Sequence, residues 1–165
     1  MFQRMPGTPV GGYDQALLEV KQRDAGRRAN GVANLGVFGN ADSVKTVKGF
    51  VEDESEAVRV AAQYALALLG QAEALPKLIA HLADERHEFR KRAAVALASV
   101  AGAGISCDHE SLESCTAAKK DFEAWWKKSG AGLKWDAKKK SFAAVGAAEG
   151  KSSILGDGKA KKGRE

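Results

Sequence analysis

The pattern of apolar and polar positions repeats itself along the middle of the chain. Residues 41–71 and 72–102 align at an offset of 31 residues. Within each copy, apolar residues spaced three and four apart indicate a short helix, a polar turn and a longer helix. A period of this length is typical of repeat proteins. The apolar positions that coincide include Val44 with Leu75, Val47 with Leu78, Val51 with Leu82, Val58 with Phe89 and Leu66 with Leu97.

A weaker copy of the same pattern precedes these two. Counting 31 residues back from the second copy aligns Arg28 with Arg59 and Leu35 with Leu66, so residues 13–40 form a first repeat. Here Asp14 is predicted to cap a helix that ends near residue 23, and a second helix is predicted over residues 26–38. Paired short helices bury their apolar faces by stacking on neighbouring pairs. The sequence therefore predicts an all-α fold, a short α-solenoid of about three helical hairpins spanning residues 13–102.

The composition changes on either side of the repeats. Residues 1–12 are rich in Pro and Gly and are expected to be an irregular lead-in. Residues 103–146 are expected to form a loop, a helix over residues 116–129, and an aromatic cap made by an extended segment or small hairpin that folds over the last repeat. Residues 147–165 are dominated by Gly, Lys and Ser and are expected to be disordered.

The order of motifs within a repeat resembles a known family. A hydrophobic helix, an Asp-containing turn, Val-Arg or Phe-Arg and then AAxxAL resemble the HEAT-like repeats of the phycobilisome-lyase type over residues 13–102. The first copy departs from this pattern, since Gln22 replaces the turn Asp and Gly31 and Asn34 replace core alanines. The later pattern WW–x6–L–x–W–D–x5–F resembles a C-terminal module of some bacterial HEAT-repeat proteins. The lyase-type resemblance implies, as one alternative, an accessory role in attaching a tetrapyrrole to a protein.

The charge is unevenly spread along the chain. Residues 1–102 hold 13 Lys/Arg and 12 Asp/Glu, whereas residues 103–165 hold 13 and 9. A solenoid that binds nucleic acid is expected to carry its positive charge along the repeats. The basic runs lie instead at residues 138–140 and 159–164. A nucleic-acid partner is therefore the less favoured alternative.

One Asp and one Arg recur in each of the two clear repeats, as Asp53 with Arg59 and Asp84 with Arg90. They form either a polar ladder that meets a ligand or a structural ladder. The structural interpretation is favoured, with each Asp capping a helix start and pairing with a repeat Arg.

The chain offers few candidates for chemistry. The pair His87-Glu88 is similar to the His-Glu pairs with which HEAT-like deoxyhypusine hydroxylases bind iron. However, there is one such pair, and it lies four residues before the family's position, where this chain has Lys91-Arg92. His81 and His109 are interpreted as isolated, so no metal site and no cofactor are expected. No nucleophile pattern and no Gly-rich phosphate loop is visible, and we expect a protein that is not an enzyme.

Two further groups of residues after the repeats have alternative interpretations. Cys107 and Cys115 enclose a short loop; a disulfide is favoured over free thiols, and a metal site comes third. Trp125, Trp126 and Trp135 form either an aromatic box for a sugar or peptide or a hydrophobic cluster that seals the end of the solenoid. The cluster is favoured because the first two tryptophans follow the spacing of a buried helix face.

In each predicted second helix, a stripe of small or apolar residues lies opposite the core. We expect this stripe to line the concave surface, either because neighbouring helices pack closely there or because it forms a protein-binding groove. The hypothesis is a non-catalytic scaffold that binds another protein through this face. The candidate partner-binding residues are Val32, Val60, Gln63, Lys91 and Ala94.

The compartment is inferred from two absences in the sequence. The start, MFQRMPGTPVGGY, has no apolar segment of the kind that signal peptides carry, and no apolar run approaches the length of a membrane span. The cytoplasm is the default expectation, and the periplasm or secretion is the alternative if a leader was removed.

Overall fold

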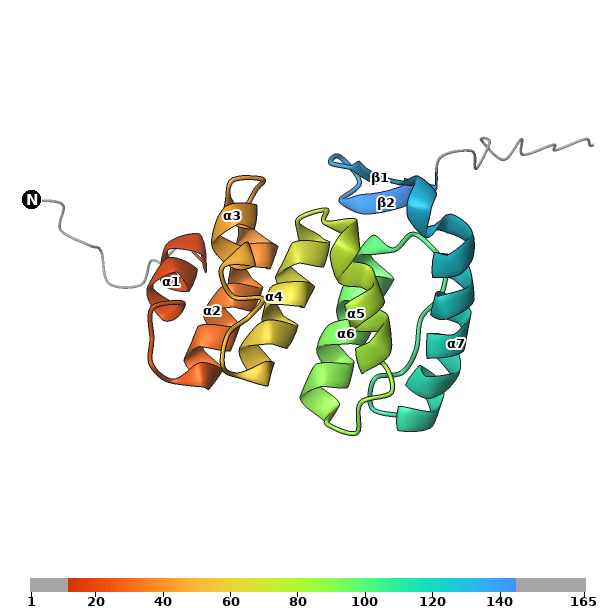
Figure 1. Cartoon of the computed structure of the whole chain (residues 1–165), viewed down its shortest axis with the longest axis horizontal. Helices are drawn as coiled ribbons and strands as arrows, with labels where there is room; N and C mark the ends of the chain where they lie inside the picture. The colour runs from red at the N-terminus through yellow and green to blue at the C-terminus, as the bar shows by residue number, and fades with distance from the viewer. Residues whose placement is uncertain (1–11, 145–165) are drawn as a thin grey trace, which may run out of the picture.

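Three helical hairpins follow one another in chain order along the longest axis of the molecule (Figure 1). The computed structural model describes residues 12–144. The predicted all-α solenoid of about three hairpins is confirmed. No helix within this range is long and apolar enough to cross a membrane. The hairpins are α1 (Gly12–Glu19) with α2 (Ala25–Phe38), α3 (Ser43–Lys48) with α4 (Glu56–Leu68), and α5 (Leu75–His81) with α6 (His87–Val100).

The first helix is shifted from its predicted position. It begins at Gly12, so Asp14 lies in its first turn and is not its cap. It ends at Glu19 because the next four residues form a turn that Arg28 stabilises, by donating to the carbonyls of Gln22 and Arg23 at 3.1 and 2.9 Å. Asp24 then caps α2, and its side chain accepts a hydrogen bond from the backbone of the third residue after it.

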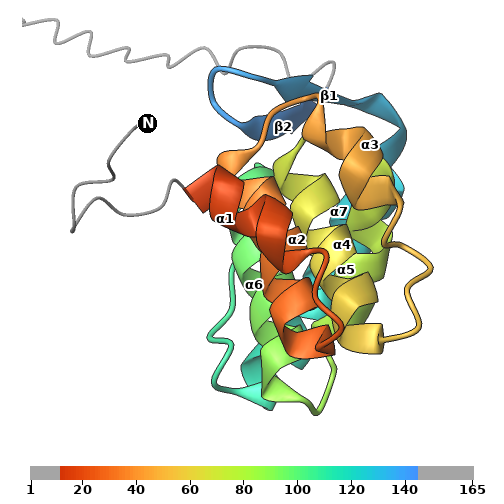
Figure 2. The same ribbon diagram turned by 90° about the vertical axis from the view of Figure 1, so that its left-hand side faces the viewer.

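A continuous apolar core runs through all three hairpins. Turned by 90°, the molecule shows α3 and α5 on one side of α4 and α6 (Figure 2). Burying each Val or Leu side chain of this core contributes about 1.5–3 kcal/mol relative to leaving it exposed. The short helices and the C-cap of α5 contribute Val47, Leu75, Leu78 and Leu82, and the long helices contribute Val32, Leu35, Val58, Leu66, Leu97 and Val100, all at most 3% exposed.

The same arginine stabilises the turn of every repeat. Arg28, Arg59 and Arg90 each donate, through Nη1, to the two carbonyls six and five residues earlier in the chain. The predicted pairing of each Asp with a repeat Arg is confirmed for Asp53, which binds Arg28, and is wrong for Asp84, which binds Arg86. The predicted capping is wrong for both, because Ser55 and Arg86 hold the N-cap positions. Within the second and third repeats, the repeat arginine contacts the backbone of the Asp, because the carbonyls of the tight turn need donors.

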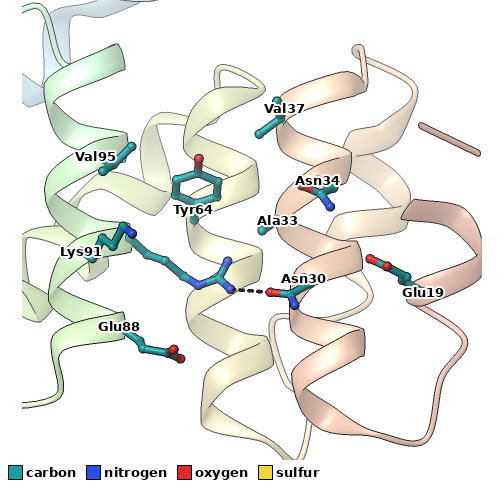
Figure 3. A pocket seen from close by; sticks show the side chains of 10 residues that line it. Glu19, Asn30, Ala33, Asn34, Val37, Tyr64, Glu88, Lys91 and Val95 are labelled. Carbon is teal, nitrogen blue, oxygen red and sulfur yellow. Dashed lines mark hydrogen bonds between the residues drawn. The ribbon is translucent and has the colours of Figure 1, made fainter. Parts of the chain in front are cut away.

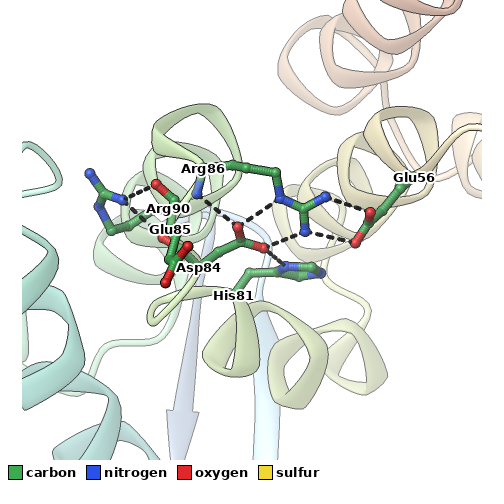
Figure 4. Close-up of polar contacts among 6 residues, drawn as sticks. All are labelled: Glu56, His81, Asp84, Glu85, Arg86 and Arg90. Carbon is green, nitrogen blue, oxygen red and sulfur yellow. Dashed lines mark hydrogen bonds and ion pairs between the residues drawn. The ribbon is translucent and has the colours of Figure 1, made fainter.

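The two recurring carboxylates have different partners. Asp53 accepts two hydrogen bonds, at 2.8 and 2.9 Å, from Arg28 of the preceding repeat. Asp84 accepts from Arg86 and lies 3.2 Å from His81, and Arg86 also binds Glu56 of the preceding repeat (Figure 4). Hydrogen bonds from these arginines hold the pKa values of both Asp53 and Asp84 below the ordinary aspartate value. Asp53 therefore joins successive repeats directly, whereas Asp84 holds Arg86, which makes the contact to the preceding repeat.

A helix and a β-hairpin follow the last repeat. Helix α7 (Leu112–Ser129) begins four residues before its predicted start, because Ser111 caps it and accepts a hydrogen bond from the backbone of Ser114 at 3.1 Å. After the 3₁₀ turn η2 (Gly130–Gly132), β1 (Leu133–Asp136) pairs antiparallel with β2 (Ser141–Ala144), which places Trp135 opposite Phe142.

The β-hairpin packs on the end of α4 through a glycine. Gly70 has a φ of +87°, and a Cβ there would lie 2.6 Å from the ring of Trp135. Phe142 is 4% exposed and belongs to the core. The hairpin therefore covers the repeats from the end where α4 and α6 terminate.

Cys107 and Cys115 are joined by a disulfide, with their Cα atoms 5.1 Å apart. This bond closes the loop that connects α6 to α7. The predicted lead-in, the predicted disordered tail and the basic run at residues 159–164 lie outside the described residues, apart from Gly12, which begins α1.

Candidate functional site

The predicted partner-binding stripe is buried between helices. Each long helix packs on its own short helix and also on the long helices of adjacent repeats, so the stripe opposite the core lies in helix–helix contacts. A Cβ on Gly36 of α2, for example, would lie 2.5 Å from the Cα of Ala65 in α4. Of the five predicted residues Lys91 alone is exposed; the buried ones, with their exposed fractions, are Val32 (0%), Val60 (1%), Gln63 (6%) and Ala94 (7%). These four residues offer little surface to a partner, although Val60 and Gln63 also line a separate hollow of about 340 Å³ beside α5.

A hollow of about 460 Å³ lies beside that stripe, on the solvent-facing side of the three long helices (Figure 3). Helices α2 and α6 form its walls, and Tyr64 of α4 forms part of its floor. We name it the Arg92 hollow. Its lining residues are Glu19, Asn30, Ala33, Asn34, Val37, Tyr64, Glu88, Lys91, Arg92 and Val95.

Arg92 spans this hollow from wall to wall. It donates a hydrogen bond of 3.2 Å to Asn30 of α2, and its guanidinium lies 6.0 Å from the centre of the Tyr64 ring. Partial burial lowers the pKa of Arg92 and raises the pKa of Tyr64. The arginine thus links the third repeat to the first across the second.

A second hollow, of about 960 Å³, continues the first toward the β-hairpin. The two share Val37 and Tyr64, so we treat them as one groove over α4. The second hollow, which we name the Trp135 hollow, is more apolar at its floor and has Lys139 and Lys140 at its edge. Its further lining residues include Gly36, Leu68, Leu69, Gly70, Ser99 and Trp135.

The polar groups of the groove include charges of both signs. In the Arg92 hollow, the charges of Lys91 and Arg92 are offset by those of Glu19 and Glu88. The Oε2 atom of Glu19 is buried and has no hydrogen-bond partner among residues 12–144. An unsatisfied buried carboxylate oxygen is costly, and a bound donor could satisfy it once the Glu19 side chain turns toward the hollow.

The three tryptophans do not form one box. Trp125 and Trp126 lie on α7 with ring centroids 6.3 Å apart and planes at 52°, and Trp125 also contacts Phe122 edge-on. Trp135 lies in the hairpin instead, where it packs on Phe142 and against Gly70, which follows α4. All three are partly buried in the described structure. Trp135 reaches the groove, and the predicted hydrophobic cluster is divided between α7 and the hairpin.

The prediction that His109 is isolated is wrong. The loop after α6 brings its Nδ1 to 3.3 Å from Nε2 of His87. Residues 22 positions apart meet here because the loop doubles back along α6, and the apolar pattern of the sequence carries no signal of that path.

The spacing of the groove residues in the sequence could have located them. Asn30, Asn34 and Val37 of α2 are spaced i, i+4 and i+7, as are Glu88, Arg92 and Val95 of α6. Long or polar residues at such spacing mark a solvent-facing stripe directly beside a stripe of alanines and glycines.

Comparison with known proteins identifies the repeats. No curated protein and no solved structure matched the chain. Residues 15–98, just over half of the chain, match the family of HEAT repeats. The matched range begins in α1 and ends in α6, so it covers all three hairpins. The chain belongs to the HEAT-repeat family.

Proposed function

We propose that this protein is a non-catalytic scaffold that binds an extended segment of another protein in the groove over α4. HEAT repeats generally serve as protein-interaction scaffolds. The observation that carries the proposal is the groove itself, which crosses all three repeats and whose floor and walls are built from side chains that differ from repeat to repeat.

The shape of the groove favours a single extended strand. It runs alongside α2 from Asn30 to Val37, about 10 Å at the rise of an α-helix, and then continues to the hairpin. Asn30 and Asn34 lie one helical turn apart, and their side-chain amides can both donate to and accept from a peptide backbone. Val37 and Val95 are 47% and 38% exposed, so they offer apolar contacts on the two walls.

The charges of the groove suggest the direction and composition of the segment. Glu19 lines the α1 end of the groove, where its carboxylate favours a donor, either an amide or a basic side chain. At the hairpin end, Lys139 and Lys140 can pair with a carboxylate of the bound segment. Between these ends, Tyr64 and Leu68 can pack against at least one apolar side chain of the segment. The mixed charge of the Arg92 hollow argues against a phosphate backbone as the ligand.

Site-specific photo-crosslinking tests the proposal. A photoreactive amino acid replaces Val95 in the groove or, as a control, Ala80, which is exposed on α5 outside the groove. After illumination in the native host, captured proteins and their attachment sites are read by mass spectrometry. We expect the Val95 derivative to be attached to one short segment of one protein, and the Ala80 derivative not to be. Equal capture from both positions, or attachment sites scattered over many proteins, would contradict the proposal.

A further inference from the structure

Three metal-ligating side chains converge at the start of α6, away from the groove. Nε2 of His87 lies 3.3 Å from Nδ1 of His109 and 3.1 Å from Oε1 of Glu110. The third side of the triangle, from His109 Nδ1 to Glu110 Oε1, is 3.4 Å. His87 comes from the first turn of α6, and the other two come from the loop that the disulfide closes.

The triangle has the dimensions of one face of a tetrahedral metal site. Ligands about 2.0–2.1 Å from a Zn²⁺ ion at tetrahedral angles lie about 3.3 Å from one another. The centroids of the two imidazole rings lie 5.4 Å apart, close to the separation of about 5 Å expected for two imidazoles bound to one ion at the same bond lengths.

Hydrogen bonding among the three groups cannot satisfy all three contacts. With Glu110 as a carboxylate, it accepts from both histidines only if each facing nitrogen carries a proton. In that case, the two N–H groups of His87 and His109 point at each other. If one nitrogen gives up its proton, its lone pair faces the carboxylate instead. A cation at the centre of the triangle satisfies all three atoms at once.

The backbone of the site is held in place by structural interactions. Arg90, which is 5% exposed, donates from Nε to the carbonyl of His109 at 2.8 Å. The backbone N–H of Glu110 donates to the side chain of Asp108 at 3.0 Å, and the disulfide joins the ends of the loop. Arg90 is the third repeat's copy of the recurring arginine. Its Nη1 binds the turn carbonyls, and its Nε holds the loop that carries His109 and Glu110, two of the three candidate ligands. Such support positions ligands before an ion arrives.

We propose that His87, His109 and Glu110 bind one divalent transition-metal ion of the Zn²⁺ class. Two imidazoles and one carboxylate suit Zn²⁺ and its neighbours, whereas Mg²⁺ and Ca²⁺ prefer oxygen ligands alone. Water completes the coordination, because the His87 and Glu110 side chains are 42% and 69% exposed. The bound ion links α6 to the loop before α7 and stabilises the junction of the last repeat with its cap.

Metal titration of the whole chain, free of affinity tags and reductant, tests the site. Without reductant the disulfide keeps both sulfurs out of competition for the ion. Zn²⁺ binding is measured by calorimetry, and Co²⁺ serves as a visible-absorption probe of four-coordination. The variants are His87→Gln, His109→Gln and Glu110→Gln, with Glu113→Gln as the matched control in the first turn of α7.

We expect one Zn²⁺ per chain and affinity at least about tenfold weaker in each of the three ligand variants. We also expect Zn²⁺ to raise the thermal midpoint of the wild type and of Glu113→Gln but not of the histidine variants. Mg²⁺ should have no effect. The absence of Zn²⁺ binding, or equal affinity in wild type and ligand variants, would overturn the proposal.

Discussion

The two junctions between successive long helices are built in different ways. Where α2 meets α4, the backbones touch at Gly36 and Ala65, and Arg28 and Asp53 form an ion pair with both side chains only 11–12% exposed. Where α4 meets α6, the connection is made by long polar side chains, such as Arg86 with Glu56, which are 53% and 43% exposed. Small residues close the first junction, and large residues keep the second partly open to solvent.

The groove lies over both junctions. Tyr64 and Arg92 fill part of the space over the second junction without covering it, and at the first junction Gly36 lines the Trp135 hollow beside its close contact with α4. A stack of identical repeats would have identical junctions between its long helices. The departures of the first repeat from the HEAT pattern, which look like decay in the sequence, therefore have a structural consequence.

The largest expected effect comes from adding one methyl group to the first junction. In Gly36→Ala, the new Cβ meets the backbone of α4, which cannot move cheaply, so we expect the free energy of unfolding to fall by about 2–3 kcal/mol. Gly26→Ala is the matched control in the same helix, because its Cβ meets only the Asp24 side chain at 3.3 Å. Urea denaturation measures both. Equal stability of the two variants would mean that the first junction is not closely packed.

A smaller loss is expected from breaking the ion pair of the first junction. Asp53→Asn leaves Arg28 largely buried beside a neutral side chain, and we expect a loss of about 2 kcal/mol. The corresponding change at the second junction, Glu56→Gln, affects an exposed pair, and its effect should lie within the error of the same measurement. If Glu56→Gln were the more destabilising change, the ion pair of the second junction would contribute more to stability than that of the first, contrary to this account.

The loss of folding stability at low pH should depend on the carboxylates of Asp53 and Asp84. The folded pKa values of Asp53 and Asp84 are lowered, while in the unfolded chain an aspartate titrates near 3.9. The unfolded state therefore takes up protons first, and the stability that these groups contribute above about pH 5 is lost as the pH falls through 3.9 and below.

Urea midpoints measured across this acid range check the assignment. Asp53→Asn and Asp84→Asn should each lose stability less steeply than wild type as the pH falls. Parallel curves for wild type and both variants would show that neither carboxylate is responsible for the loss of stability at low pH.

The sequence predicts the repeats well because their signal is periodic. The 31-residue offset locates α4 and α6 closely, since Val58, Leu66 and their counterparts must reach the core in every copy. Burial of the opposite stripe could not be predicted from the same pattern. Alanine and glycine suit both a shallow groove and a tight helix contact, and only the separation of the helices decides between them.

The partners of polar residues were predicted less well than the helices. Asp84 pairs with Arg86 rather than Arg90, and His87 meets His109, because turn and loop geometry decides these contacts. Such geometry depends on backbone hydrogen bonds and on the disulfide, which leave no spacing rule in the sequence.

The central claim is that the open junction over α4 holds a protein segment. The most direct measurement is the Kd of the segment identified by crosslinking for wild type, Val95→Glu and Ala80→Glu. Both substitutions put a carboxylate at an exposed position on a helix, but only the first lies in the groove. We predict that Val95→Glu weakens binding at least about tenfold while Ala80→Glu leaves it unchanged. Unchanged binding by Val95→Glu, or an equal loss in both variants, would contradict the account.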